Sequence, residues 1–294
     1  MKDYLILLTG TPRGGIQSWK SLIKYVKEPL NCDLALLCGD KFELPDYLYS
    51  KAKFIWKFKE PENWRDFYYE NFANTDAIDF LIQGEKYGMA GGIDNYSGSG
   101  AIVCGFKIIV FNNYMNEIMN YRNIIHTRFD QFYIDYHPKF QGSKIWIPEG
   151  EDYYGICDRH AIFPSKYAEK YFGIGKFLNS EEAKINFHNK EITPESVLLE
   201  NLRYQHIIDS IERIDRFQFT AATTSDQTRW RKAIYKLHFS NDIMIKYPDE
   251  FLDSVRNFVD RNNFFSYFKK PILIFNYYYL NLRKYLGALI NPKK

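Results

Sequence analysis

Two short apolar runs near the N-terminus flank an amphipathic helical pattern, and this arrangement restricts the fold more than any other feature. Residues 3–10 read DYLILLTG and residues 32–39 read CDLALLCG, and both are continuous apolar runs that end at glycine, as buried strands do. Between them, apolar residues recur at helical spacing from Ile16 to Val26, before Pro29. A strand–helix–strand unit predicts a parallel sheet. We therefore expect an α/β fold, with a mostly parallel, Rossmann-like sheet flanked by helices.

The loop after the first strand lies where such sheets bind ligands, beyond the carboxyl ends of the strands. Residues 9–15 read TGTPRGG, which matches neither the P-loop nor the dinucleotide-binding pattern. Thr9, Gly10 and Arg13 are candidates for binding a diphosphate or a base. The alternative is an ordinary strand-to-helix turn with a solvated arginine.

A glycine- and serine-rich stretch, YSGSG at 96–100, precedes a second apolar helical pattern. Ser97 and Ser99 can be helix N-caps. They can also belong to a helix start that holds an anionic or ribosyl ligand.

A further apolar run, RNIIHTRFD, ends in an arginine and an aspartate. Arg128 and Asp130 follow a predicted strand, so they are expected at the same edge of the sheet. Mg²⁺ or Mn²⁺ at a diphosphate needs only one or two protein carboxylates, which makes Asp130 a candidate metal ligand and Arg128 a candidate phosphate contact. The alternative is an Arg–Asp ion pair at a strand end.

The stretch EGEDYYGICDRH at 149–160 is dense in acids. Asp158 follows an apolar pair, and we expect this shelter to raise the pKa of its carboxyl, as a general base requires. Gly155 is expected to leave room for a substrate beside the backbone. Glu195, in the first turn of a helix that Thr193 and Pro194 begin, is either a second candidate base or an acid stabilised by the helix dipole.

Composition excludes several classes of protein. Of 294 residues, 39 are basic and 36 acidic, and a net charge of +3 does not predict nucleic-acid binding. The four cysteines form no C-x-x-C pair and lie among apolar neighbours, which indicates reduced core thiols in a cytoplasmic protein. We expect no signal peptide and no transmembrane span, because the first apolar stretch is short and no long apolar run follows.

Six segments in this order resemble a family of small GT-A-type glycosyltransferases of bacterial polysaccharide clusters and large DNA viruses, including chlorella viruses. The resemblance covers roughly residues 4–215. The segments are LLTGTPRGGIQSWKSL, CDLALL, YSGSGAI, IIHTRFDQFY, IWIPEGEDYYGICDRHAIFPSKYAEKYF and TPESVLLENL. The resemblance implies a GT-A-like catalytic domain over 1–215, and we expect a helical C-terminal extension packed on it over 216–294.

The same resemblance implies transfer of a sugar from a nucleotide-sugar, a UDP-sugar above all, to a hydroxyl of a glycan acceptor with inversion. It assigns Asp158 the role of base, and Glu195 that of a second candidate. Thr9, Arg13, Ser97 and Ser99 would lie by the donor. The family's Asp-x-Asp motif is absent, and RFD stands in its place, so Mn²⁺ or Mg²⁺ would be held by Asp130 alone while Arg128 takes over part of the charge neutralisation.

Two other functions compete with this one. A non-catalytic glycan- or nucleotide-binding protein on a degenerate GT-A fold would also lack Asp-x-Asp. A nucleotidyltransferase would share the sheet and the phosphate site but would require more metal-binding carboxylates. The aromatic, basic segment 271–294 is predicted either to lie on a membrane surface as a peripheral anchor, or to pack on the rest of the chain or on a second copy.

Overall fold

The computed structural model divides the chain into two compact units, which are described separately. The first unit comprises residues 1–12, 30–128 and 139–214, and the second unit comprises residues 13–29, 129–138 and 215–294. Within them the structure describes residues 2–72, 76–82, 87–94, 99–140, 142–226, 233–240, 242–262 and 268–290.

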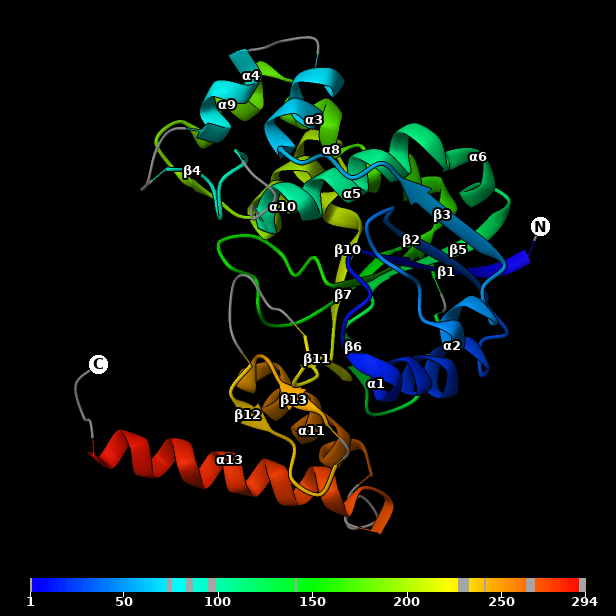
Figure 1. Ribbon diagram of the computed structural model, residues 1–294, viewed down its shortest axis with the longest axis vertical. Coiled ribbons are helices and arrows are strands. Elements are labelled where there is room, and N and C mark those ends of the chain that lie inside the picture. The colour runs from blue at the N-terminus through cyan, green and yellow to red at the C-terminus, as the bar shows by residue number, and fades with distance from the viewer. Residues whose placement is uncertain are drawn as a thin grey trace. The chain divides into compact units, whose positions relative to one another are not determined.

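A seven-stranded sheet lies at the centre of the first unit (Figure 1), with its strands in the order β10-β7-β8-β5-β1-β2-β3. β3, β2, β1 and β5 are parallel, β8 runs antiparallel between β5 and β7, and β10 is parallel to β7. The α/β fold with a mostly parallel sheet is therefore confirmed. The strands are β1 (Lys2–Thr9), β2 (Asp33–Gly39), β3 (Phe54–Phe58), β5 (Tyr121–Arg128), β7 (Ile145–Pro148), β8 (His160–Pro164) and β10 (Ile211–Ile214).

Helices flank this sheet and share one apolar core with it. The long helix α5 has a mostly apolar sequence, as a helix buried among other elements requires. It lies against α3 at Gly105, where an added Cβ would come within 2.3 Å of the Trp64 ring. The helices are α2 (Asp46–Tyr49), α3 (Trp64–Asn71), α4 (Asp76–Asp79), α5 (Ser99–Asn113), α6 (Met115–Ile118), α7 (Ala168–Phe172), α8 (Ile174–Leu178), α9 (Glu181–Phe187) and α10 (Pro194–Tyr204), and a two-stranded sheet pairs β4 (Gly88–Met89) with β9 (Glu191–Ile192).

Local sequence signals account for the best-defined boundary in this unit. Helix α10 begins after Thr193, whose hydroxyl accepts a hydrogen bond from the backbone N–H of Ser196, while the Ser196 hydroxyl accepts one from the backbone N–H of Thr193. Pro194 occupies the first helical position. This reciprocal capping box fixes the position of the first turn, and therefore of Glu195.

Strand β8 has no counterpart in the sequence prediction. All five of its residues pair with β5, and Ile162 also pairs with Trp146 of β7. The segment is too short for its periodicity to distinguish a strand from a buried connection, and only pairing on both sides defines it.

The second unit contains a four-stranded antiparallel sheet in the order β12-β13-β11-β6. A core of aliphatic and aromatic side chains joins this sheet to α11 and α13. Its elements are α1 (Gly15–Leu22), continued by a π-helical turn (Ile23–Lys27), β6 (Gln131–Tyr133), β11 (Gln218–Ala222), β12 (Tyr235–Lys236), β13 (Met244–Ile245), α11 (Pro248–Asn262) and α13 (Pro271–Ile290).

This composition differs from the helical extension over 216–294 that the sequence predicts. The chain does enter the second unit near the expected boundary, at Asp215, but 13–29 and 129–138 also belong to it. The sheet went unpredicted because its strands have only two to five residues. Alternation cannot be recognised over such lengths.

Two glycines of the first predicted loop are required by packing within the second unit. Gly14 has φ 90°, and an added Cβ would lie 2.7 Å from the Cα of Asp130. Gly15 has φ 71°, and its added Cβ would lie 2.5 Å from the Thr223 methyl group. A left-handed backbone and a close approach both exclude side chains here, so these glycines serve packing.

All four cysteines are buried and unpaired, as the prediction of reduced core thiols requires. Across the ranges that the structure describes, no helix has both the length and the apolar character needed to cross a bilayer.

Candidate functional site

The strand order of the first unit reverses direction between β1 and β5. The chain places β2 and β3 on one side of β1 and then crosses to place β5 on the other side. In open α/β sheets, ligands bind outside the carboxyl ends of the strands at this reversal. Thr9 and Arg128, the last residues of β1 and β5, are register partners there. The sheet therefore brings together two of the predicted donor-binding residues, and Gly10 directly follows one of them.

Hydrogen bonds between uncharged side chains link Thr9, at this edge, to the interior of the unit. The Thr9 hydroxyl lies 3.0 Å from Nε2 of His126, and Nδ1 of His126 lies 3.2 Å from the Tyr171 hydroxyl. Burial, together with the positive charge of Lys107, holds the pKa of His126 well below its ordinary value, so the imidazole is neutral. Sequence analysis missed this residue, although a histidine inside the apolar run IIHT was a visible signal.

Four charged side chains form a buried cluster in the same unit. Nζ of Lys107, from α5, lies 3.4 Å from a carboxylate oxygen of Asp158, and both side chains are 2% exposed. Arg159 lies 3.6 Å from a carboxylate oxygen of Glu195, from the first turn of α10. The structure thus brings together the two predicted bases, Asp158 and Glu195, with two cations that the sequence analysis did not identify.

The pKa of Asp158 differs from the sequence expectation. Burial alone would raise it, as predicted, but the charges of Lys107, Arg159 and Arg128 outweigh burial and lower it below its ordinary value. Asp158 is therefore a carboxylate held ionised by its neighbours. Lys107, the single charged residue in helix α5, was the signal that could have revealed this pairing.

The raised pKa that was expected of Asp158 is found at Glu195 instead. Burial, together with the negative charge of Asp158, raises the pKa of Glu195 to about 7, against the opposing charge of Arg159. A carboxyl group with a pKa near 7 can both accept and donate a proton at neutral pH. Of the two predicted bases, Glu195 has the environment suited to proton transfer.

The loop between β7 and β8 positions both carboxylates. Asp152 accepts a hydrogen bond from the backbone N–H of Cys157 at 2.8 Å and pairs with Arg213 at 2.9 Å, which fixes the fold of the loop. The backbone N–H of Ile156 donates to the carbonyl oxygen of Glu195 at 3.1 Å. The loop that carries Asp158 is thereby tied to the helix that carries Glu195.

Gly155 lies at the closest point of this contact. An added Cβ would come within 2.0 Å of the carbonyl oxygen of Glu195 and 2.3 Å of the backbone nitrogen of Ser196. The backbone of α10 thus occupies the space beside Gly155 that the sequence analysis left for a substrate.

We expect Gly155→Ala to lower the free energy of unfolding by about 1–3 kcal/mol, because helix backbone cannot move aside as a flexible side chain can. Urea denaturation measures the effect. Gly175→Ala is the matched control: its added Cβ would meet Ile108 at 3.4 Å, an ordinary contact, within a helix that favours alanine. Equal stability of the two variants would contradict the close contact at Gly155.

The raised pKa of Glu195 also makes stability depend on pH. The unfolded chain loses this proton near pH 4.5 and the folded chain near pH 7, so the folded state binds more protons between these values. The contribution to stability is complete below pH 4.5 and is lost as pH rises through about 7, amounting to about 3 kcal/mol. We expect Glu195→Gln to flatten this part of the stability profile measured by urea unfolding, while Glu200→Gln, at a partly exposed position of α10, leaves it unchanged.

Of the remaining predicted site residues, Arg13 and Asp130 belong to the second unit, and Ser97 lies outside the described residues. Ser99 is the first residue of α5. The role of Ser97 and Ser99 in holding a ligand at this helix start therefore stays a prediction.

A divalent cation would need more ligands than Asp130 supplies. Asp130 is buried, at 5% exposure. Among the residues that the structure describes, no three histidine, cysteine, aspartate or glutamate side chains gather where they could hold a metal ion. Asp130 therefore fits a cation only as one protein ligand alongside phosphate oxygens and water, as is common for Mg²⁺.

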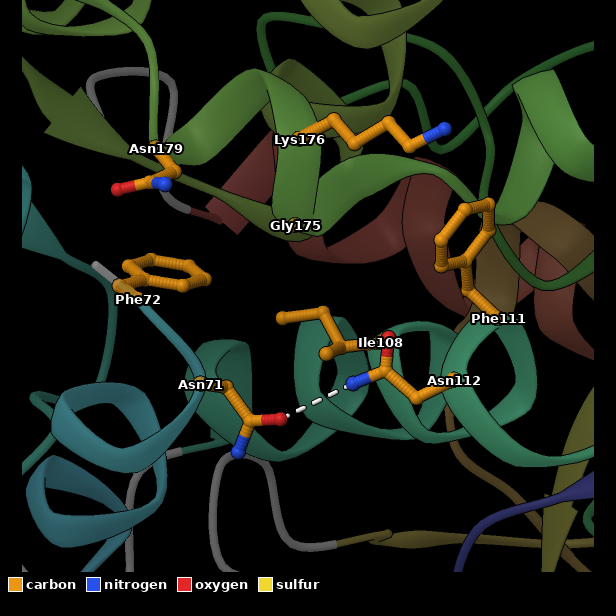
Figure 2. A pocket seen from close by; sticks show the side chains of 8 residues that line it. All are labelled: Asn71, Phe72, Ile108, Phe111, Asn112, Gly175, Lys176 and Asn179. Atoms are coloured by element: carbon orange, nitrogen blue, oxygen red, sulfur yellow. Dashed lines mark hydrogen bonds between the residues drawn. The ribbon is translucent and has the colours of Figure 1, made fainter. Parts of the chain in front are cut away.

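A small pocket in the first unit lies apart from the predicted site residues, none of which lines it. It has a volume of about 150 Å³ and is formed by α3, α5 and α8, and Asn112 donates a hydrogen bond at 3.0 Å to Asn71, which also lines it (Figure 2). Pockets for ligands of drug size have about 300–1,000 Å³. This pocket is therefore too small to hold a nucleotide-sugar.

Comparisons with protein-family models and with curated proteins returned no match to this chain. The structure thus defines an α/β protein whose strand order reverses between β1 and β5, with a buried charged cluster in the same unit.

Proposed function

We propose that this protein is a glycosyltransferase that moves a sugar from a nucleotide-sugar, a UDP-sugar above all, to a hydroxyl of a glycan acceptor. The observation that carries the proposal is the coincidence, in one unit, of a switch-point edge bearing Thr9 and Arg128 with a carboxyl group, Glu195, whose pKa is about 7. The first provides a place for an anionic nucleotide, and the second provides a proton acceptor.

The mostly parallel sheet supports a GT-A-like assignment of the first unit, together with the order of the sequence segments that resemble that family. Six of the seven strands run in the same direction, and only β8, which lies between β5 and β7, is antiparallel to its neighbours. A nucleotide would bind beyond the carboxyl ends of β1 and β5.

In the proposed mechanism Glu195 accepts the proton of the acceptor hydroxyl. The acceptor oxygen then forms a bond to the anomeric carbon of the donor, while the bond from that carbon to the diphosphate breaks and its electron pair leaves with the diphosphate. This single displacement inverts the anomeric carbon. Arg128 is half-buried and lies at the strand end, where its charge would stabilise the negative charge that develops on the leaving group.

Asp158, the other predicted base, has a supporting role in this proposal. Its ionised carboxylate beside Lys107 contributes the negative charge that raises the pKa of Glu195. Removing that charge would lower the pKa of Glu195 and shift the pH dependence of the reaction.

The proposal is tested by measuring nucleotide release from a panel of UDP-, GDP-, CMP- and dTDP-sugars, with and without sugar acceptors. We expect release from one donor, accelerated by an acceptor and weakened by Arg128→Gln. Arg122→Gln is the matched control, because Arg122 lies in the same strand and pairs with Asp3 on the surface. The proposal would be refuted if no donor is turned over and none raises the unfolding temperature.

A second candidate is a non-catalytic nucleotide- or glycan-binding protein. It is favoured by the mutual compensation of the four buried charges, since a network of this kind can serve structure alone. Protection from thermal unfolding by one nucleotide-sugar, without turnover under any acceptor condition, would support it over catalysis.

Asp130 as a ligand of Mn²⁺ or Mg²⁺ is a separate part of the proposal. A bound cation would supply positive charge against the phosphates of a donor. We expect Asp130→Asn to weaken Mn²⁺ binding, measured by calorimetry in the presence of a nucleoside diphosphate, whereas Asp135→Asn in the same segment leaves it unchanged. Equal Mn²⁺ affinity of the two variants would remove Asp130 as a ligand.

A further inference from the structure

Helix α13 buries one face and exposes another that is equally apolar. On the buried side, Leu273 and Leu280 enter the core of the second unit, and the Asn276 side chain exchanges hydrogen bonds with the backbone of His238 at 2.8 and 3.1 Å. Figure 1 shows α13 beside α11, with which it packs. The helix is therefore held in place by contacts that leave its other face uncovered within the described residues.

The exposed face is a continuous apolar surface. Seven side chains on it are 38–64% exposed, and at about 100° per residue they fall within an arc of about 140°. Arg283 lies at one margin of this arc, and the arc itself contains no charged residue. The seven are Ile272, Phe275, Tyr278, Tyr279, Leu282, Tyr285 and Leu286.

A neighbouring loop extends this surface. Phe239 is 75% exposed, and its ring lies 5.2 Å from the ring of Phe275. With Phe239, eight exposed apolar side chains form the patch, and contiguous exposed apolar patches mark interaction sites.

The charge of the C-terminal part of the sequence indicates what covers the patch. From residue 261 to residue 294 the chain has seven lysines and arginines and no acidic residue. Lys284 pairs with Asp249 of α11. An anionic partner complements the remaining charge, whereas a second copy of the chain would bring the same positive charge to the interface.

The composition of the patch suits a lipid interface in particular. Three of its seven members are tyrosines, whose rings are apolar and whose hydroxyls can remain among head groups. An amphipathic helix with an apolar face and flanking lysines and arginines binds in the plane of such an interface, through both buried area and attraction to anionic lipids.

We propose that α13 binds the surface of an anionic phospholipid membrane with this apolar face. The proposal is independent of the proposed catalytic function, because it uses no residue of the first unit. It assigns the second unit the role of a peripheral membrane anchor.

The test is flotation of the full chain with vesicles of phosphatidylcholine alone and with vesicles containing phosphatidylglycerol. We expect the protein to float with the anionic vesicles and to bind them at least tenfold more tightly than the neutral ones, with the difference shrinking at high salt. Protein that stays at the bottom of the gradient with anionic vesicles would overturn the proposal.

Paired substitutions locate the surface. Phe275→Ser with Leu282→Ser is expected to reduce binding at least tenfold, because membrane affinity scales with buried apolar area. Ile185→Ser, at a site in α9 that is 74% exposed, is the matched control and should bind as the unchanged protein does. Thermal unfolding verifies that each variant is folded. A dimer in solution that the paired substitution dissociates, without vesicle binding by the unchanged protein, would assign the face to a second copy instead.

Discussion

Glutamine in place of Glu195 is expected to lower the turnover number about 100- to 10,000-fold, the range that a positioned general base contributes. Glutamine has nearly the same shape but accepts no proton in this range of pH. Donor binding should change little, because the diphosphate is expected to meet Arg128 and Thr9 instead. Steady-state kinetics with the donor and acceptor found by the release assay measure the effect.

The pH profile provides the more specific signature. Turnover by the unchanged protein should rise with pH through about 7, as Glu195 ionises. This limb should be missing from the residual activity of Glu195→Gln. Glu200→Gln lies in the same helix, where Glu200 pairs with Arg203 at 2.5 Å on the surface, and should retain both the rate and the profile. A full rate with an unchanged profile for Glu195→Gln would exclude Glu195 as the base.

The largest effect on stability is expected from Lys107→Met. This substitution replaces the ammonium group of Lys107 by an apolar group on a side chain of similar length, and it leaves Asp158 buried without the cation with which it pairs. Breaking a buried ion pair from one side costs about 3–5 kcal/mol, because the remaining charge loses its compensation. Chemical denaturation at neutral pH measures the loss.

A double substitution separates the charge effect from the packing effect. Lys107→Met combined with Asp158→Leu removes both charges, and it should recover much of the stability lost in the single variant. Lys176→Met is a surface control, since the Lys176 ammonium lies over the Phe111 ring at 4.6 Å on the outside of the unit. Additive losses in the double variant would show that Lys107 and Asp158 do not interact as a pair.

Several elements could be predicted from local sequence because their signals are local. β1 and β2 are continuous apolar runs that end at glycine, and such runs have few alternatives to a buried strand. The start of α10 could be predicted to the residue, because Thr193 caps the first turn and Pro194, which has no N–H, suits the first helical position. Asp158 was recognisable as a candidate because it follows an apolar pair, and Glu195 because it lies in the first turn of α10.

The tertiary structure decided what those candidates can do. Lys107 and Asp158 are 51 residues apart in the chain, and only packing of α5 beside the loop before β8 brings their charges together. The pKa of a buried group depends on its burial and on all the charges around it. The lowered pKa of Asp158 and the raised pKa of Glu195 therefore could not be predicted from the sequence neighbours of either residue.

The same distinction applies to the organisation of the chain. The apolar patterns of individual segments determined that this protein has an α/β fold with a mostly parallel sheet, because the apolar pattern of a segment determines which of its faces is buried. The assignment of 13–29 and 129–138 to the second unit, and the pairing of strands of two to five residues within it, depend on contacts between distant segments. Those contacts have no local periodicity, and so only the folded chain determines them.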